Sequence, residues 1–201
     1  QRTAIILKSY EYGLLPVHSS LLMRPLIQLE DSRLIINYCH AVNRRGDLFK
    51  IKEGRRYIVW TLQKLASRKE FFARAMGLLL KFSVSENEDF VNNAKGCFSS
   101  YFQIYLSDTE ATLSHKLNVI NAYINDKDED VRLIILNAVC QGCHTGGFRK
   151  FSSDETQGST FVMKEWRPET KKDEKKYILS FLDIFGKICL EDSMVGEVAR
   201  K

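Results

Sequence analysis

Residues 56–82 read RYIVWTLQKLASRKEFFARAMGLLLKF, and this stretch decides the fold class. In its first half Ile58, Val59, Leu62 and Leu65 recur at spacings that place them on one side of a helix. The second half has a stripe of the same period, made of Phe71, Phe72, Ala75, Leu78, Leu79 and Phe82. Because only residues 67–69 separate the two stripes, the stretch predicts two helices folded back on each other as a hairpin.

A third helix is predicted to begin at Ser85-Glu86-Asn87-Glu88, which matches a capping box. Glu86, Glu88 and Asp89 would then stabilise its first turn through the helix dipole rather than serve as catalytic carboxylates. This helix would run to about Leu106. Its apolar face is wide enough for burial on two sides, which favours core packing over base stacking. The face consists of Phe90, Val91, Ala94, Cys97, Phe98, Tyr101, Phe102 and Tyr105.

Three further helices follow the same 3.6-residue period. The fourth spans about 113–124 and the fifth about 131–142, where Gly142 and the later Gly146-Gly147 are typical of a helix end. The periodicity then disappears over 148–170, which predicts a long connection that either contacts a partner or is pinned onto the helices by Phe161, Val162 and Trp166. A sixth helix should begin behind Thr170, an acceptable N-cap.

These elements predict an all-α chain, an α-α superhelix that stacks antiparallel helix pairs. With 3 prolines and 11 glycines, the composition argues against an all-β fold. We divide the chain into an N-terminal helical or irregular segment that continues a preceding region (1–55), helix pairs (56–147), a connection (148–172) and a further helix (173–201).

The segment from Ser114 to His144 resembles a HEAT repeat, with a helix, an acidic turn at 125–130, and Val131-Arg132 opening a second helix. In that family an aspartate of the turn and an arginine early in the second helix tie adjacent repeats. The resemblance implies such structural roles for Asp128 or Asp130 and for Arg132. It also implies a HEAT/armadillo-like solenoid.

Four other stretches are similar to the helical region of large bacterial multidomain proteins proposed as antiphage sensors, which carry a nucleotide-binding or NAD-directed effector domain. They are Arg56–Leu62, Ser85–Glu88 with Asn92-Asn93-Ala94, Asp108–Ala111 and Glu165–Thr170. The resemblance implies a sensor or scaffold role, with any ATP hydrolysis performed elsewhere in the longer protein.

Composition and chain ends bear on location. No apolar run approaches the roughly 20 residues that cross a bilayer, so we expect no membrane partner. The odd count of 5 cysteines fits free thiols in a reducing cytoplasm. Because the chain begins with Gln1 and ends at Arg200-Lys201 within unfinished patterns, we expect it to be part of a larger protein, which would also provide any homo-oligomerisation.

Cys140-Gln141-Gly142-Cys143-His144 has the C-x-x-C-H spacing of c-type haem attachment. A helix end that happens to contain two small thiols explains it better, because no export signal or haem pocket accompanies it. A zinc site would need a fourth ligand such as Cys39 or His40 from far along the chain. There is no Gly-rich phosphate loop, and the four histidines (His18, His40, His115, His144) are isolated. We therefore expect no catalytic residue, metal or cofactor.

Two clusters of basic residues accompany the net charge of +5. If folding brings them together, they would follow a phosphate backbone. The clusters are Arg44, Arg45, Lys50, Lys52, Arg55 and Arg56, and later Lys171, Lys172, Lys175 and Lys176.

The preferred hypothesis is a non-catalytic interaction or sensor scaffold module that binds a protein partner or neighbouring domains of the same chain. The second hypothesis is a nucleic-acid-binding helical-repeat module that uses the basic clusters. The third is an enzyme whose site has no recognisable motif.

Overall fold

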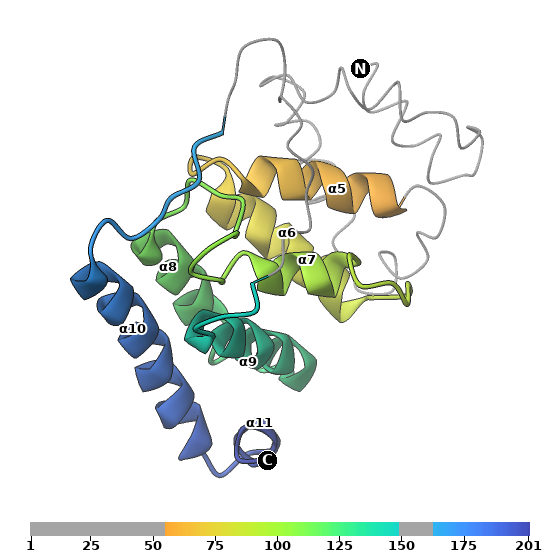
Figure 1. Ribbon diagram of the computed structural model, residues 1–201. Coiled ribbons are helices and arrows are strands. Elements are labelled where there is room, and N and C mark those ends of the chain that lie inside the picture. Colours follow the sequence, from red (N-terminus) through yellow and green to blue (C-terminus); the bar gives the residue numbers. More distant parts are fainter. Residues whose placement is uncertain (1–54, 149–162) are drawn as a thin grey trace.

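The computed structural model describes residues 55–148 and 163–201, which form seven α-helices and no strand (Figure 1). The all-α prediction is confirmed for these residues. Residues 1–54 and 149–162, which include most of the predicted N-terminal segment and of the long connection, lie outside the described part. The helices are α5 (Arg55–Ala66), α6 (Phe72–Val84), α7 (Ala94–Ser100), α8 (Leu113–Tyr123), α9 (Glu129–Cys143), α10 (Lys171–Cys189) and α11 (Met194–Ala199).

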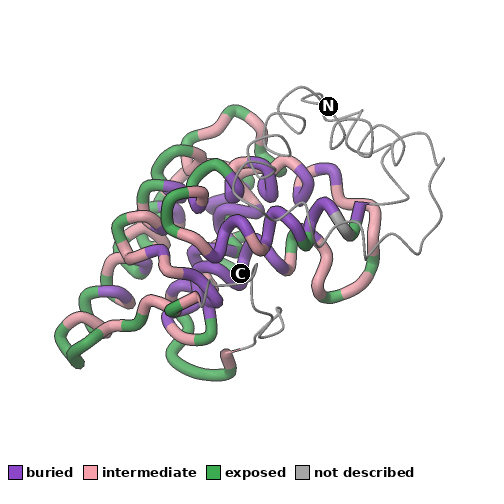
Figure 2. Tube along the Cα trace, turned by 90° about the horizontal axis from the view of Figure 1, so that it is seen from above, coloured by how far each residue is buried: buried purple, intermediate pink, exposed green. Residues whose placement is uncertain are grey.

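Helix α6 lies at the centre of the molecule. Leu78, Leu79 and Leu80 are consecutive, so they point to different sides of the helix, yet each is at most 2% exposed. Such a helix must be covered on several sides, and α5, α7, α8 and α9 all pack against it, whereas Ala73 and Arg74 are exposed on the remaining side. The predicted hairpin of residues 56–82 is confirmed as α5 and α6. Figure 2 shows the buried residues gathered in the middle of this helical body.

Helix α9 joins the central body to the last two helices. Ile134, Ile135, Ala138 and Val139 contribute to the main core, and α9 also packs on α10 and α11. Its Leu136 belongs to a second, smaller cluster with Ile188 of α10 and Val195 of α11. The short α11 has no counterpart in the sequence prediction.

The predicted third helix is wrong in its start and its length. Helix α7 begins nine residues after the expected capping box, where the side chain of Asn93 accepts a hydrogen bond from the backbone N–H of Gly96 (2.9 Å). Phe98, Tyr101 and Phe102 are buried as expected, but the helix ends at Ser100 and turns follow.

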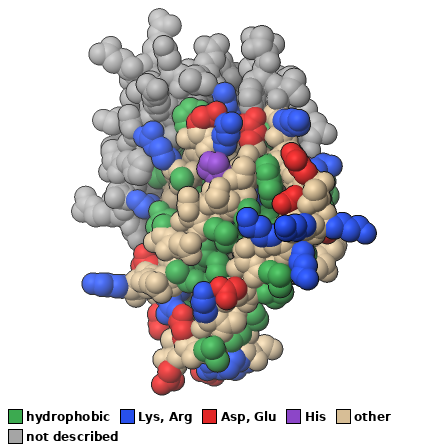
Figure 3. Space-filling model, turned by 90° about the vertical axis from the view of Figure 1, so that its left-hand side faces the viewer, with side chains coloured by type: hydrophobic (Ala, Val, Ile, Leu, Met, Phe, Trp, Pro, Cys, Tyr) green, Lys and Arg blue, Asp and Glu red, His purple; other side chains and the backbone are tan. Residues whose placement is uncertain are grey.

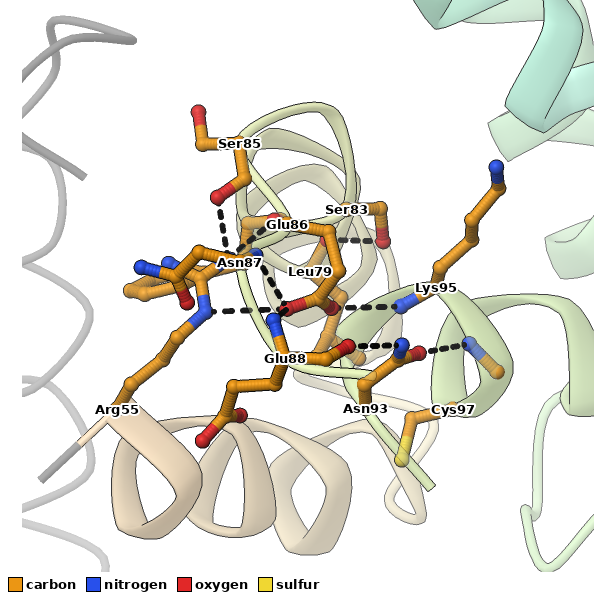
Figure 4. A network of polar contacts seen from close by, with 12 residues as sticks. Arg55, Leu79, Ser83, Ser85, Glu86, Asn87, Glu88, Asn93, Lys95 and Cys97 are labelled. Carbon is orange, nitrogen blue, oxygen red and sulfur yellow. Dashed lines mark hydrogen bonds and ion pairs between the residues drawn. The ribbon is translucent and has the colours of Figure 1, made fainter. Parts of the chain in front are cut away.

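The carboxylate of Glu86 takes a different role from the predicted helix cap. It accepts hydrogen bonds from the backbone N–H groups of Asn87 (3.0 Å), Glu88 (3.2 Å) and Lys95 (3.4 Å), and from Nε of Arg55 (3.3 Å) (Figure 4). Glu86 therefore organises a loop. The acidic residues 86, 88 and 89 lie in that loop and not in the first turn of a helix.

Arginines occupy the free carbonyls at three helix ends. The last carbonyls of a helix lack intrahelical donors, and a guanidinium has five N–H groups to offer them. Each of these arginines also joins two segments of the fold. The bonds run from Arg55 to the carbonyls of Phe82 (2.5 Å) and Ser85 (2.8 Å), from Arg132 to that of Ile124 (2.9 Å), and from Arg200 to those of Cys189 (2.7 Å) and Glu191 (3.0 Å).

The residues that resemble a HEAT turn have structural roles. Asp128 caps α9 by accepting from the backbone N–H of Asp130 (3.0 Å). Arg132 forms an ion pair with Glu191, at the turn between α10 and α11. This arginine thus links the start of α9 to the last pair of helices.

The predicted helix end near Gly142 is confirmed, because α9 ends at Cys143, but Gly142 has a further role. It is buried in the last turn of α9, where an added Cβ would lie 2.3 Å from Cδ1 of Phe181. Its role is to let α10 approach α9 closely. The left-handed glycine lies further on, at Gly147 (φ 70°). The predicted cap of α10 is confirmed, because Oγ1 of Thr170 accepts from the backbone N–H of Asp173 (3.1 Å).

Replacing Gly142 by alanine should lower the free energy of unfolding by about 2 kcal/mol, because the added methyl group overlaps the Phe181 ring. Gly186 is the matched control, since a Cβ added there would meet no neighbouring atom within 4 Å. Gly186→Ala should raise stability by about 0.5–1 kcal/mol through helix propensity. Chemical denaturation of both variants measures the two effects. Equal effects would contradict the close α9–α10 contact.

Candidate interaction surface

Aromatic residues fix α10 onto the core. The hydroxyl of Tyr177 donates to the backbone carbonyl of Phe102 (2.6 Å), and its ring stacks with Trp166 at a centroid distance of 6.0 Å. Phe181 lies one turn further along and is fully buried. The orientation of α10 is therefore set by its inner face.

A buried lysine also packs against the Tyr177 ring. Nζ of Lys116 on α8 donates to the carbonyl of Gln103 (2.9 Å) and to Oγ of Ser107 (3.1 Å), and lies 5.2 Å from the Tyr177 ring centroid. Its side chain is completely buried. Burial disfavours the charged form and lowers the pKa of Lys116 to about 7, against the raising effect of nearby Glu165. The sequence could have indicated that Lys116 is buried, because it lies three and four residues before Val119 and Ile120 on the apolar face of α8.

The residues just before α10 are hydrogen-bonded to the loop that precedes α8. Glu165 accepts from the backbone N–H of Ser107 (2.7 Å), and the N–H of Trp166 donates to the carbonyl of Thr109 (2.8 Å). The loop it meets is strained, because Leu106 and Asp108 have φ angles of 56° and 52°. Of the two alternatives for the connection, pinning is thus confirmed at Trp166, whereas Phe161 and Val162 lie outside the described residues.

The outer face of α10 carries an exposed apolar stripe. Leu179, Leu182 and Leu190 are 51%, 44% and 88% exposed, and Gly186 lies between the last two. Spacings of three and four residues keep them on one side of the helix, opposite Tyr177 and the other buried residues. Lys172 and Lys175 extend the same stripe toward the helix start, and both are exposed.

The stripe and its lysines form the candidate surface, which we call the α10 face and define as Lys171, Lys172, Lys175, Lys176, Leu179, Leu182, Gly186 and Leu190. Figure 3 views the molecule from the side on which α10 lies. Lys and Arg side chains gather there beside apolar ones. Large aliphatic side chains on the outside of a well-packed helix are typical of a contact surface.

Of the first basic cluster the structure describes only Arg55 and Arg56, and neither lies beside the lysines of α10. Arg55 is wrongly predicted as a nucleic-acid contact, because its side chain is fully buried and bonded to Glu86 and to two carbonyls. Arg56 is exposed, with its guanidinium over the Phe90 ring at 4.1 Å. The start of α5 and the start of α10, which carries the four exposed lysines, lie on opposite sides in Figure 1. Arg44, Arg45, Lys50 and Lys52 lie outside the described residues.

Cys140 and Cys143 lie in the last two turns of α9, and both are half-buried. Burial raises the pKa of the Cys140 thiol, and raises that of Cys143 to about 11, so both are poor thiolates at neutral pH. Residues 55–148 and 163–201 contain no group of three His, Cys, Asp or Glu side chains arranged to hold a metal ion. Cys39 and His40 lie outside these ranges.

Among the described helices none is long and apolar enough to span a bilayer. Comparisons with protein-family models, with curated proteins and with solved structures find no significant match to the chain. The functional argument therefore rests on the chain's own surfaces.

Lys116→Met should make the protein less dependent on pH. In the wild type the lysine has a pKa of about 7 when folded and an ordinary, higher value when unfolded. The unfolded state therefore binds more protons between those values, so the contribution of Lys116 to stability is lowest below pH 7 and rises as the pH increases. The wild type should gain about 3 kcal/mol relative to Lys116→Met between pH 6.5 and 9.5. Denaturant unfolding at both pH values measures the gain, and parallel pH profiles would contradict it.

Proposed function

We propose that this chain is a non-catalytic protein-interaction module whose contact surface is the α10 face. The observation that carries the proposal is the line of exposed leucines at 179, 182 and 190 on a helix whose opposite side is firmly packed. Ordering such a helix before binding reduces the entropic cost of association. A rigid helix with an outward apolar stripe is suited to pack against another helix.

The chemistry of the face defines its partner. Lys171, Lys172, Lys175 and Lys176 are all exposed, and they precede the leucines along α10. A complementary protein surface would carry apolar residues opposite the leucines and acidic residues opposite the lysines. Such a partner is a neighbouring domain or a separate protein with an acidic amphipathic helix.

The helix contacts are compatible with a HEAT-like role. α6 packs on α9 and α9 packs on α11, as the second helices of successive pairs would in such a stack, while α7 lies against both α6 and α9. This pattern supports, as part of the proposal, a superhelical stack that scaffolds neighbouring domains. With the resemblance to antiphage sensors, the proposed biological role is a sensor or scaffold region of a larger bacterial defence protein.

A second candidate function is nucleic-acid binding by the lysines of α10. The exposure of all four favours it, since solvent-exposed lysines can neutralise phosphates. However, the same face continues into leucines, which can form neither ion pairs nor hydrogen bonds with a phosphate backbone. Protein recognition uses both halves of the surface and is therefore the preferred proposal.

A photo-reactive benzoylphenylalanine at position 182 should cross-link the chain to another protein surface when the protein is expressed in cells. The control position is Asn121, which is exposed on α8. Cross-linking at 182 above the level at 121, and its loss when Leu179 is replaced by glutamate, is the expected result. Equal cross-linking at both positions would refute the α10 face as the contact surface.

Neutralising the four lysines separates the two candidate functions. Anisotropy of labelled single- and double-stranded DNA and RNA with the 201-residue chain should show no binding at low salt. The variant with Lys171, Lys172, Lys175 and Lys176 replaced by glutamine should behave identically. Binding that weakens steeply with salt and disappears in this variant would favour the nucleic-acid function instead.

A further inference from the structure

A polar groove separates α7 from α9. It encloses about 320 Å³. Its walls come from one side of each helix, because the lining positions recur at intervals of three and four residues. Those on and just after α7 are Gly96, Ser99, Ser100 and Gln103, and those on and just after α9 are Asn137, Gln141 and His144.

Burying polar groups between two helices is costly unless they are hydrogen-bonded. Ser99, Ser100 and Gln103 are nonetheless at most 7% exposed. Two bonds cross the groove: Nδ2 of Asn137 donates to Oγ of Ser99 (3.0 Å), and Nε2 of Gln103 donates to Oε1 of Gln141 (3.3 Å). Apolar residues would pack the seam more simply, as they do elsewhere in the core, so packing alone does not account for these side chains.

The two crossing bonds leave binding capacity on α9. A carboxamide has two N–H donors and an oxygen that accepts two bonds. Within residues 55–148 and 163–201, Oδ1 of Asn137 and Nε2 of Gln141 engage in no hydrogen bond. These residues are four apart on α9, so an acceptor and a donor line the groove one helical turn apart.

The groove also lacks permanently charged side chains. None of the described residues that line it is Lys, Arg, Asp or Glu. A phosphate or a carboxylate would find no lysine or arginine there. Phe148 supplies an apolar wall and is held by an edge-on contact with Tyr105 at 5.5 Å between ring centroids. The fitting ligand is neutral and presents an N–H beside a C=O.

We propose that this groove binds an uncharged polypeptide segment through its peptide or carboxamide groups. Oδ1 of Asn137 accepts from the segment's N–H, and Nε2 of Gln141 donates to its C=O. The inference rests on the proposed protein-recognition function, but it uses different helices from the α10 face. The groove would then be a second contact surface. It would bind a loop of a partner protein, whereas the α10 face would bind a helix.

An NMR titration of the ¹⁵N-labelled 201-residue chain tests the groove directly. The probe is N-acetylglutamine methylamide, which is neutral and carries both peptide and carboxamide groups. The side-chain amide signals of Asn137, Gln141 and Gln103 should shift and reach saturation, whereas that of Asn121, exposed on α8, should not move. The double variant Asn137→Leu, Gln141→Leu lacks two of these signals, and in it the shift of the Gln103 signal should disappear while the backbone spectrum remains that of a folded protein.

Two further titrations complete the design. Cytidine should produce no saturable shift, and inorganic phosphate none at all. Absence of saturation with the glutamine compound, or stronger saturation with cytidine, would overturn the proposal, the latter in favour of a nucleobase site. The cross-linking test concerns position 182 on α10, which does not line the groove. If cross-linking fails but the titration saturates, the α10 face is rejected as a contact surface and the groove is retained.

Discussion

The enclosure of α6 is the constraint on which the rest of the structure depends. Its three consecutive leucines at 78–80 are buried on three sides of the helix, so other helices must pack on all of these sides. One of them, α9, then has its opposite side free to receive α10 and α11. The position of the α10 face follows from this order, because α10 is held to the body through α9 and the aromatic contacts of Tyr177.

Two buried basic side chains contribute to this packing. Arg55 and Lys116 are both fully buried, and each donates to backbone carbonyls of another segment of the chain. Arg55 also has Glu86 as a counter-ion, whereas Lys116 donates to neutral acceptors and burial lowers its pKa. Both side chains hold loops in place.

Local periodicity predicted the helices that pack by their own stripes, including the α5–α6 hairpin, α8, α9 and the Thr170 cap of α10. It failed where a distant residue decides the outcome. Glu86 looked like part of a capping box, but Arg55, 31 residues earlier, uses its carboxylate. Gly142 does lie at a helix end, but the sequence did not reveal that it accommodates the ring of Phe181. Both candidate sites also required the tertiary structure, because only the packing of α10 and of α7 on α9 reveals which side faces outward.

If the α10 face is a protein contact, a protein covers it in the cell. Hydroxyl-radical footprinting measures this cover by comparing oxidation of Leu179, Leu182 and Leu190 in cells and in the purified chain. Trp60, which is 37% exposed on α5, is the internal reference. We expect the three leucines to be protected in cells while Trp60 is oxidised equally in both. Equal oxidation of the leucines in cells and in the purified chain would contradict it.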